Sequence, residues 1–197
     1  MTTTEQSVSV LLEKASLRRL IGERIRKAGR RTRREWDEEI AARLVSSETF
    51  GLARVVVGYF SLSDEVNVDP VLAKAVEEGK SALVPVVRGE GMTFAKWTPC
   101  VTLMRSGSGV LQVAEAGLDL RGVGDCLVLL PGRVFDRAGG RVGRGRGYYD
   151  RVLGRRMRGV NLAGVGYELQ LVEAVPVEEH DQRVEMMFTE QGCIDCR

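Results

Sequence analysis

The sequence predicts one α/β domain of three layers, in which a mostly parallel sheet carries helices on both faces. Short apolar segments alternate along the chain with segments of helical periodicity, which is the order of elements found in α/β proteins. The apolar segments are continuous rather than interrupted by polar residues, as is typical of parallel strands buried on both faces. We find no internal repeat and no linker, so a single domain is expected to span residues 1–197.

Composition and charge limit the classes of protein to which the chain can belong. Hydrophobic residues make up 44% and charged residues 28%, which is ordinary for a globular protein with a substantial core. No apolar run approaches the roughly 18 residues that span a bilayer, and the N-terminus lacks the pattern of a signal peptide. We therefore expect a cytoplasmic protein with no membrane partner. The net charge of +2 is too small to indicate nucleic-acid binding, although arginines are dense in residues 18–34 and 133–158.

The N-terminal segment is expected to be helical after a short lead. Residues 1–10 are predicted to be flexible. Two helices should follow at residues 11–27 and 33–45, because apolar residues recur there at helical spacing and a glycine-containing break separates them. Lys14 and Arg18 are four positions apart, so they share a face of the first helix. Judged by spacing alone, that face is an ordinary solvated cationic surface.

The first strand is expected at residues 54–60, shortly before Glu65. A carboxylate just beyond the carboxyl end of a parallel strand lies where open α/β sheets bind their ligands. The next helix should begin with Asp69 as its N-cap and Pro70 at its first position, and it should end at Gly79.

The remaining strands are expected at residues 81–87, 92–97, 126–130, 162–167 and 182–189, with a short helix from Tyr148 to about Arg155. Pro85 cannot donate a ladder hydrogen bond, so a strand end or bulge is predicted there. Residues 98–124 show no clear pattern and are predicted to be irregular. Cys193 and Cys196 have the spacing of a metal-binding pair, but no second pair accompanies them. We interpret them as incidental residues of a frayed C-terminus.

Residues 136–150 form the most informative segment of the sequence. Glycines and arginines alternate there, and the members of this pattern are Arg141, Gly143, Arg144, Gly145, Arg146 and Gly147. Glycine lets an anion approach backbone N–H groups closely, and guanidinium groups bind phosphate oxygens through paired hydrogen bonds. A buried strand is expected before this loop and a helix after it, which is the arrangement of a phosphate site.

This glycine loop matches neither the Walker P-loop nor the Gly-x-Gly-x-x-Gly dinucleotide pattern. A flexible basic surface loop is the simpler alternative. However, Tyr148, Tyr149 and Asp150 follow the glycines directly, and a mobile linker has no need of such residues. The sequence therefore favours an anion-binding site.

Several motifs occur in the order found in one enzyme family. Lys14-Ala-Ser-Leu17-Arg18 is similar to that family's N-terminal Lys-x-x-Leu-Arg, and Asp64-Glu65 fits the segment around its folate-contacting Glu. Gly140–Asp150 is very similar to its ATP loop. Weaker matches follow at residues 166–170, 175–176 and 180–181. On these motifs the chain resembles the 5-formyltetrahydrofolate cyclo-ligase family, also called methenyltetrahydrofolate synthetases, over nearly its full length.

The resemblance implies an ATP- and Mg²⁺-dependent enzyme whose partners are two small molecules, ATP and a reduced formyl folate. It would convert 5-formyltetrahydrofolate to 5,10-methenyltetrahydrofolate and release ADP and phosphate. In this family ATP phosphorylates the formyl oxygen and folate N10 closes the ring. Phosphoryl transfer mainly requires positioning and charge neutralisation, so no covalent nucleophile is needed, and Lys14 and Arg146 would stabilise the phosphate.

The resemblance also assigns roles to individual residues. The residues implied for ATP binding are Lys14, Arg18, Arg141, Gly143, Arg144, Gly145, Arg146, Gly147, Tyr148 and Tyr149. Those implied for folate binding are Phe60, Glu65 and Tyr148. Asp150 and Asp181 would hold Mg²⁺, which needs only one or two protein carboxylates.

Two departures from the family pattern keep other functions open. Residues 109–113 lack the family's Glu-Pro, and Arg146 stands where a lysine is usual, so a planar fork replaces a point charge. One alternative is a catalytically divergent paralogue that binds nucleotide in a regulatory or interaction role. Another is a nucleic-acid-binding module, against which the acidic residues near the loop argue. His180 could suggest acid–base chemistry, but a lone histidine beside Asp181 is more often structural.

Overall fold

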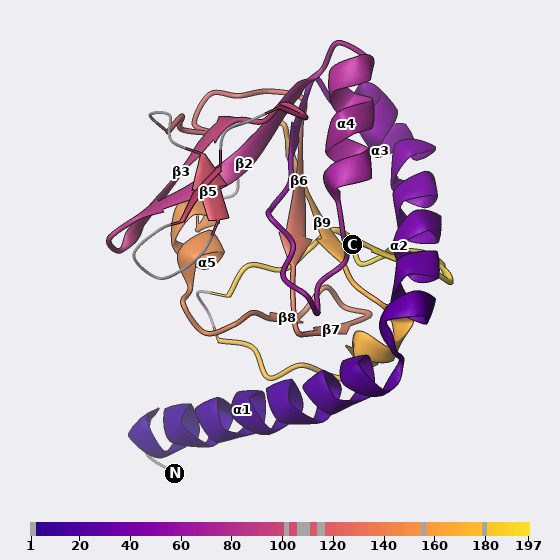
Figure 1. Cartoon of the computed structure of the whole chain (residues 1–197). Coiled ribbons are helices and arrows are strands. Elements are labelled where there is room, and N and C mark those ends of the chain that lie inside the picture. The colour runs from indigo at the N-terminus through magenta and orange to yellow at the C-terminus, as the bar shows by residue number, and fades with distance from the viewer. Residues whose placement is uncertain (1–2, 101–102, 106–110, 114–116, 155–156, 179–180) are drawn as a thin grey trace.

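The molecule is built around a seven-stranded sheet of order β12-β11-β9-β6-β1-β2-β3 (Figure 1). In this computed structural model, residues 3–100, 103–105, 111–113, 117–154, 157–178 and 181–197 are described. The strands of the sheet are β1 (Val55–Val57), β2 (Ser81–Arg88), β3 (Gly91–Lys96), β6 (Cys126–Pro131), β9 (Val160–Val165), β11 (Met186–Thr189) and β12 (Gly192–Asp195). The five inner strands are parallel, and the edge strands β3 and β12 are antiparallel to their neighbours. The prediction of a mostly parallel sheet is confirmed.

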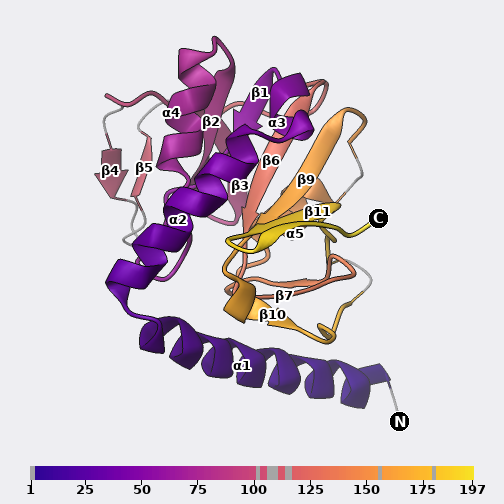
Figure 2. The same cartoon turned by 90° about the vertical axis from the view of Figure 1, so that its right-hand side faces the viewer.

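Helices cover both faces of the sheet, as predicted. They are α1 (Thr3–Lys27), α2 (Arg30–Val45), α3 (Glu48–Leu52), α4 (Asp69–Glu77), α5 (Tyr148–Leu153) and the 3-10 helix η1 (Glu168–Gln170). α2 and α4 pack side by side on one face, and the short α5 lies on the other (Figures 1 and 2). Within the described part of the chain, no helix combines the length and the apolar character needed to cross a bilayer.

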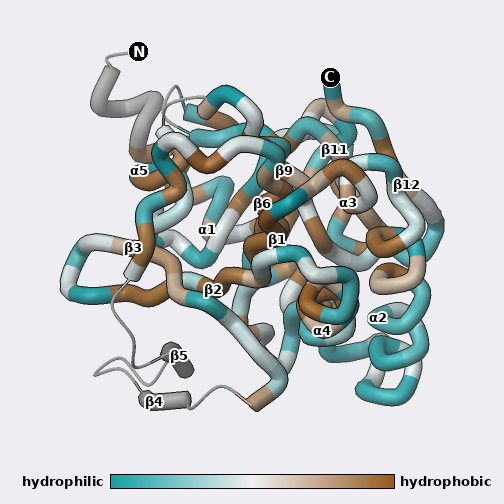
Figure 3. Tube along the Cα trace, turned by 90° about the horizontal axis from the view of Figure 1, so that it is seen from above, coloured by the Kyte–Doolittle hydropathy of each residue, from teal (hydrophilic) through white to brown (hydrophobic). Residues whose placement is uncertain are grey.

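Each face of the sheet has its own hydrophobic core. Val56 and Leu127 face the cluster that packs against α2 and α4, whereas the next residues, Val57 and Val128, face the cluster that contains Leu153 of α5. Successive side chains of a strand point to opposite faces, so a strand covered on both sides must be apolar throughout. This explains the continuous apolar segments in the sequence. In Figure 3, hydrophobic colour follows β1, whereas hydrophilic colour covers most of α2.

α1 lies across the end of the sheet at which the parallel strands terminate (Figures 1 and 2). It contacts η1 and β7 (Val134–Asp136). β7 belongs to a small second sheet with β8 (Arg141–Val142) and β10 (Leu171–Val172), in the order β10-β7-β8. The N-terminal helix therefore lies next to the loops in which the sequence places the site.

The structure corrects several predictions of local structure near the N-terminal half. α1 already begins at Thr3, so helix replaces most of the flexible lead expected at residues 1–10. The N-cap of α4 is Val68 rather than Asp69, because the Asn67 side chain accepts the hydrogen bond of the Asp69 N–H at 3.0 Å and Asp69 becomes the first helical residue. β2 continues through Pro85 without ending, since β1 stops at Val57 and no ladder bond is lost on that side.

Two further corrections concern segments without a clear pattern. Within residues 98–124, expected to be irregular, β4 (Leu103–Arg105) and β5 (Leu111–Val113) form an antiparallel pair. The C-terminus is not frayed, because β12 pairs along its length with β11 and includes Cys193. All four cysteines are free thiols, and burial raises the pKa of Cys126 to about 12.

Candidate active site

The candidate site lies where the order of the parallel strands reverses. From β1 the chain crosses by way of α4 to β2 on one side, whereas from β6 it proceeds to β9 on the other. The loops after the adjacent strands β1 and β6 therefore diverge, and the crevice between such loops is the usual ligand site of an open α/β sheet. A cavity of about 670 Å³ opens at this point.

All of the residues predicted for ligand binding line this one cavity, although they come from α1, the loop after β1, the glycine loop and the segment before β11. They are Lys14, Arg18, Phe60, Glu65, Arg141, Gly143, Arg144, Gly145, Arg146, Gly147, Tyr148, Tyr149, Asp150 and Asp181. Their assembly is a structural finding. The role of each stays a prediction.

Lys14 connects α1 to the C-terminal part of the cavity. Its Nζ lies 2.8 Å from Glu178 Oε2 and 2.6 Å from Asp181 Oδ2, and only 5% of the residue is exposed. Burial alone would lower the pKa of Lys14, but hydrogen bonds to Asp181 and Glu178 outweigh it and raise this pKa. Lys14 is therefore a permanent cation held against two carboxylates.

Arg18 anchors the glycine loop to the same helix. One turn after Lys14, its Nε donates to the carbonyl oxygen of Gly143 at 2.8 Å. Two glycines of this loop have φ angles of 93° (Gly145) and 61° (Gly147), a region that side-chain-bearing residues rarely adopt. Gly147 is directly followed by α5, so the turn delivers Tyr148, Tyr149 and Asp150 into the first turn of that helix.

Arg141 and Asp150 form a buried pair at the base of the loop. Arg141 Nη2 donates to Asp150 Oδ1 at 2.7 Å, and its Nη1 donates to the Pro131 carbonyl at 3.2 Å. Among the described residues, Arg141 Nε is a buried polar atom without a hydrogen-bond partner. The guanidinium lies 6.0 Å from the ring of Tyr149, whose pKa burial raises above its ordinary range. Arg141 thus places a positive charge, almost fully buried from solvent, in the cavity wall.

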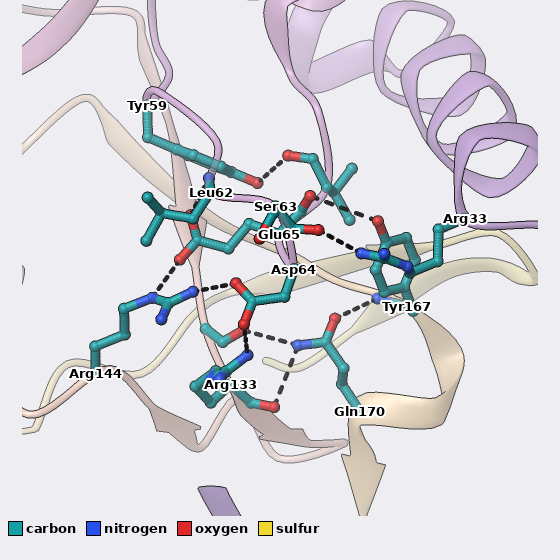
Figure 4. A network of polar contacts seen from close by, with 12 residues as sticks. Arg33, Tyr59, Leu62, Ser63, Asp64, Glu65, Arg133, Arg144, Tyr167 and Gln170 are labelled. Atoms are coloured by element: carbon teal, nitrogen blue, oxygen red, sulfur yellow. Dashed lines mark hydrogen bonds and ion pairs between the residues drawn. The ribbon is translucent and has the colours of Figure 1, made fainter. Parts of the chain in front are cut away.

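Arg144 connects the glycine loop to the loop after β1 (Figure 4). Its Nε donates to Glu65 Oε1 at 2.8 Å, and its Nη2 contacts Asp64. Asp64 also pairs with Arg133, which follows β6. Burial raises the pKa of Asp64, but the guanidinium groups of Arg144 and Arg133 together lower it by more, so this pKa lies below its ordinary value. The two loops that diverge at the switch point are therefore joined by ion pairs.

One wall of the cavity is apolar. Pro85, Val87 and Met92 of the β2–β3 hairpin line it together with Phe60 and Tyr148. The Tyr148 hydroxyl donates to the Gly89 carbonyl at 3.4 Å, which joins α5 to the tip of this hairpin. The cavity therefore combines a surface for flat rings with a dense set of cations.

Comparison with known proteins assigns this arrangement to a family. A sequence model described as the 5-formyltetrahydrofolate cyclo-ligase family matches residues 11–190. The chain belongs to the 5-formyltetrahydrofolate cyclo-ligase family. It is 25% identical to the mouse 5-formyltetrahydrofolate cyclo-ligase over 200 residues, which covers 94% of this chain and 98% of the mouse protein. The 5-formyltetrahydrofolate cyclo-ligase of Escherichia coli K12 is 29% identical over 156 residues, which covers 75% of this chain and 84% of the E. coli protein.

Solved structures agree with this membership in the cyclo-ligase family. The solution structure of the Aquifex aeolicus 5,10-methenyltetrahydrofolate synthetase superposes with a TM-score of 0.79 at 26% identity, and 93% of each chain is covered. The resemblance inferred from the motifs is thereby confirmed.

Some residues of this cyclo-ligase-family site were missed from the sequence. Glu178 carries no motif and is recognisable only once Lys14 is placed beside it. Pro85, Val87 and Met92 of the apolar wall were missed because nothing in the sequence distinguishes them from other strand residues, and only the fold places the β2–β3 hairpin beside the cavity. His180 lies outside the described residues, as do residues 109–110 of the segment that lacks the family's Glu-Pro.

The donor set suits a hard divalent cation that is shared with a phosphate ligand. Asp150 and Asp181 line the same cavity, and the backbone N–H of Gln182, the residue after Asp181, donates to Asp150 Oδ1 at 3.3 Å. The part of the chain that the structure describes contains no cluster of three or more metal-ligating side chains. Mg²⁺ usually takes one or two protein carboxylates and completes its shell with water and phosphate, so two carboxylates beside the glycine loop fit it.

Proposed function

We propose that this protein catalyses the ATP-dependent conversion of 5-formyltetrahydrofolate to 5,10-methenyltetrahydrofolate, with release of ADP and phosphate. The γ-phosphoryl group of ATP is transferred to the formyl oxygen. Folate N10 then attacks the activated formyl carbon and loses its proton to solvent, and the C–O bond breaks as phosphate leaves with that oxygen. The observation that carries the proposal is the convergence of α1, the glycine loop and Glu65 on one cavity in a member of the cyclo-ligase family.

The cationic residues act on the triphosphate. Charge on the transferred phosphoryl group is spread over its oxygens, so several fixed cations stabilise the transition state without a covalent intermediate. Lys14 and Arg18 approach from α1 and Arg141 from β8. Arg146 makes no hydrogen bond or ion pair within the described residues and its side chain is exposed, so it is available to the phosphates. Glycine backbone N–H groups add further donors.

The acidic and aromatic residues act on the folate. The Glu65 side chain is only 9% exposed, and its carboxylate accepts paired N–H donors of the pterin ring. Phe60 and Tyr148 flank the ring from the apolar wall. The two substrates therefore meet between the loop after β1 and the glycine loop, and the formyl group faces the phosphates.

Asp150 and Asp181 would hold Mg²⁺ in this site. When bound, the ion neutralises phosphate charge and orients the transferred group. Arg141 pairs with Asp150 and Lys14 pairs with Asp181, which holds the two carboxylates in place. Their positions are thus set before the nucleotide arrives.

The direct test is an assay with purified protein, Mg-ATP and 5-formyltetrahydrofolate, in which the methenyl chromophore should form with stoichiometric release of phosphate. Binding of ATP without turnover would instead support the divergent paralogue. Salt-sensitive binding of nucleic acid without ATP binding would contradict the proposal altogether.

A further inference from the structure

We propose that Arg144 is an internal ligand of Glu65 that leaves when the pterin binds, and that its release couples the folate site to the nucleotide site. This inference rests on the proposed function. It assigns Arg144 a positioning role that neither the motif nor the family membership supplies.

Each oxygen of the Glu65 carboxylate accepts a hydrogen bond from within the protein (Figure 4). Its Oε1 accepts from Arg144 Nε at 2.8 Å, and its Oε2 accepts from the Leu62 backbone N–H at 3.0 Å. The Leu62 contact comes from the same loop and fixes the orientation of the carboxylate. The Arg144 contact comes from the glycine loop, 79 positions away in the sequence.

The guanidinium of Arg144 resembles the edge of the ligand that Glu65 would bind. A pterin presents N3–H and the 2-amino group side by side, which is the same donor pattern as two nitrogens of a guanidinium. Both are planar forks matched to a carboxylate. Arg144 and the pterin therefore compete for Oε1 of Glu65, and one must leave before the other binds.

Two features of the structure lower the free-energy cost of releasing Arg144, and a third gives the released side chain a role. Asp64 keeps its ion pair with Arg133 when Arg144 departs. The Arg144 side chain is 38% exposed, and its neighbours Gly143 and Gly145 have no side chains that would block its rotation. The released guanidinium then lies in the loop that lines the phosphate-binding cavity. Folate binding should thus improve nucleotide binding, and by linkage nucleotide should improve folate binding by the same factor.

The test measures the dissociation constant of 5-formyltetrahydrofolate by calorimetry, with and without a non-hydrolysable ATP analogue and Mg²⁺. In the wild-type protein the analogue should lower this constant by roughly fivefold or more. In Arg144→Gln, the folate should bind roughly fivefold more tightly than to wild type without nucleotide, because its competitor is gone. The analogue should then change the affinity little.

A second variant and a control separate this role from a structural one. Asp64→Asn removes the negative charge of one of the two carboxylates that hold Arg144 and leaves Glu65 intact, so it should also tighten folate binding without nucleotide, by a smaller factor. Arg137→Gln removes an exposed arginine that pairs with Glu168 outside the cavity, and it should match wild type.

Weaker or unchanged folate binding in both Arg144→Gln and Asp64→Asn would overturn the competition. If the ATP analogue leaves the dissociation constant of 5-formyltetrahydrofolate unchanged in the wild-type protein, the coupling is overturned. If wild-type protein does not bind 5-formyltetrahydrofolate at all, the proposed function itself fails, which is a different result from either of these.

Discussion

Lys14 Nζ lies 2.6 Å from Asp181 Oδ2, although 167 positions separate the two residues in the sequence. This contact brings the N-terminal helix and the segment before the penultimate strand to the same cavity. α1 otherwise meets the domain mainly through η1 and β7. The pair therefore both fastens α1 and places a buried cation among the groups proposed to bind the phosphates.

Replacing Lys14 should impair both stability and turnover. In Lys14→Met, Glu178 and Asp181 lose their shared counter-ion while their side chains stay mostly buried, at 27% and 13% exposure. We expect a loss of about 2 kcal/mol in the free energy of unfolding, below the value for a fully buried pair. The kcat/KM for Mg-ATP should fall roughly 100-fold. Lys27→Met, at the exposed end of the same helix, is the control and should leave both quantities unchanged.

Asp150→Ala should abolish Mg-ATP-dependent turnover. Asp150 is one of the two carboxylates proposed for Mg²⁺, and it also holds the buried guanidinium of Arg141. The measurement is the rate of methenyl formation as a function of Mg²⁺ concentration, with Asp150→Asn as the variant that keeps the side-chain shape. Near-normal rates in both variants at ordinary Mg²⁺ concentrations would rule out the metal assignment. Asp119→Ala, an exposed carboxylate outside the cavity, provides the control.

The ion pairs of Asp64 should appear in the pH dependence of stability. Burial raises the pKa of Asp64, but Arg144 and Arg133 lower it below its unfolded value on balance. A depressed pKa stabilises the folded state above the unfolded pKa of about 4, and this stabilisation is lost as the pH falls through the folded value.

Asp64→Asn should therefore be less stable than wild type by about 1 kcal/mol at pH 7, because the pair is partly exposed. The difference should shrink as the pH falls below about 4. Urea unfolding at a series of pH values measures it. A difference that is independent of pH would mean that charge is not the source of the effect.

The sequence could predict the location of the site because its motifs fall at strand ends. Once the apolar segments at residues 54–60 and 126–130 are recognised as adjacent parallel strands, Glu65 and the glycine loop must meet at the same edge of the sheet. The glycines of the loop are also informative in the sequence. Gly145 and Gly147 have positive φ angles, which only glycine adopts readily.

The pairing of charges could not be predicted. Arg144 and Arg146 are equivalent in the sequence pattern, yet one binds two carboxylates and the other makes no such contact within the described residues. Which cation meets which carboxylate depends on the three-dimensional path of the loops. The edge strand β12 was missed for a related reason, because its pairing with β11 overrides a weak local strand propensity.

Gly132→Ala should destabilise the fold through steric overlap with Phe135. A Cβ at position 132 would lie 2.8 Å from Phe135 Cε2, and the fully buried ring cannot move away because it also packs against Gly164 and Gly166. Overpacking of this kind costs about 2 kcal/mol in the free energy of unfolding, which urea titration measures. Gly51→Ala is the matched control, since nothing lies within 4 Å of a Cβ in that helix, and it should not destabilise the protein. Equal stability of Gly132→Ala and wild type would show that β7 can shift to relieve the contact.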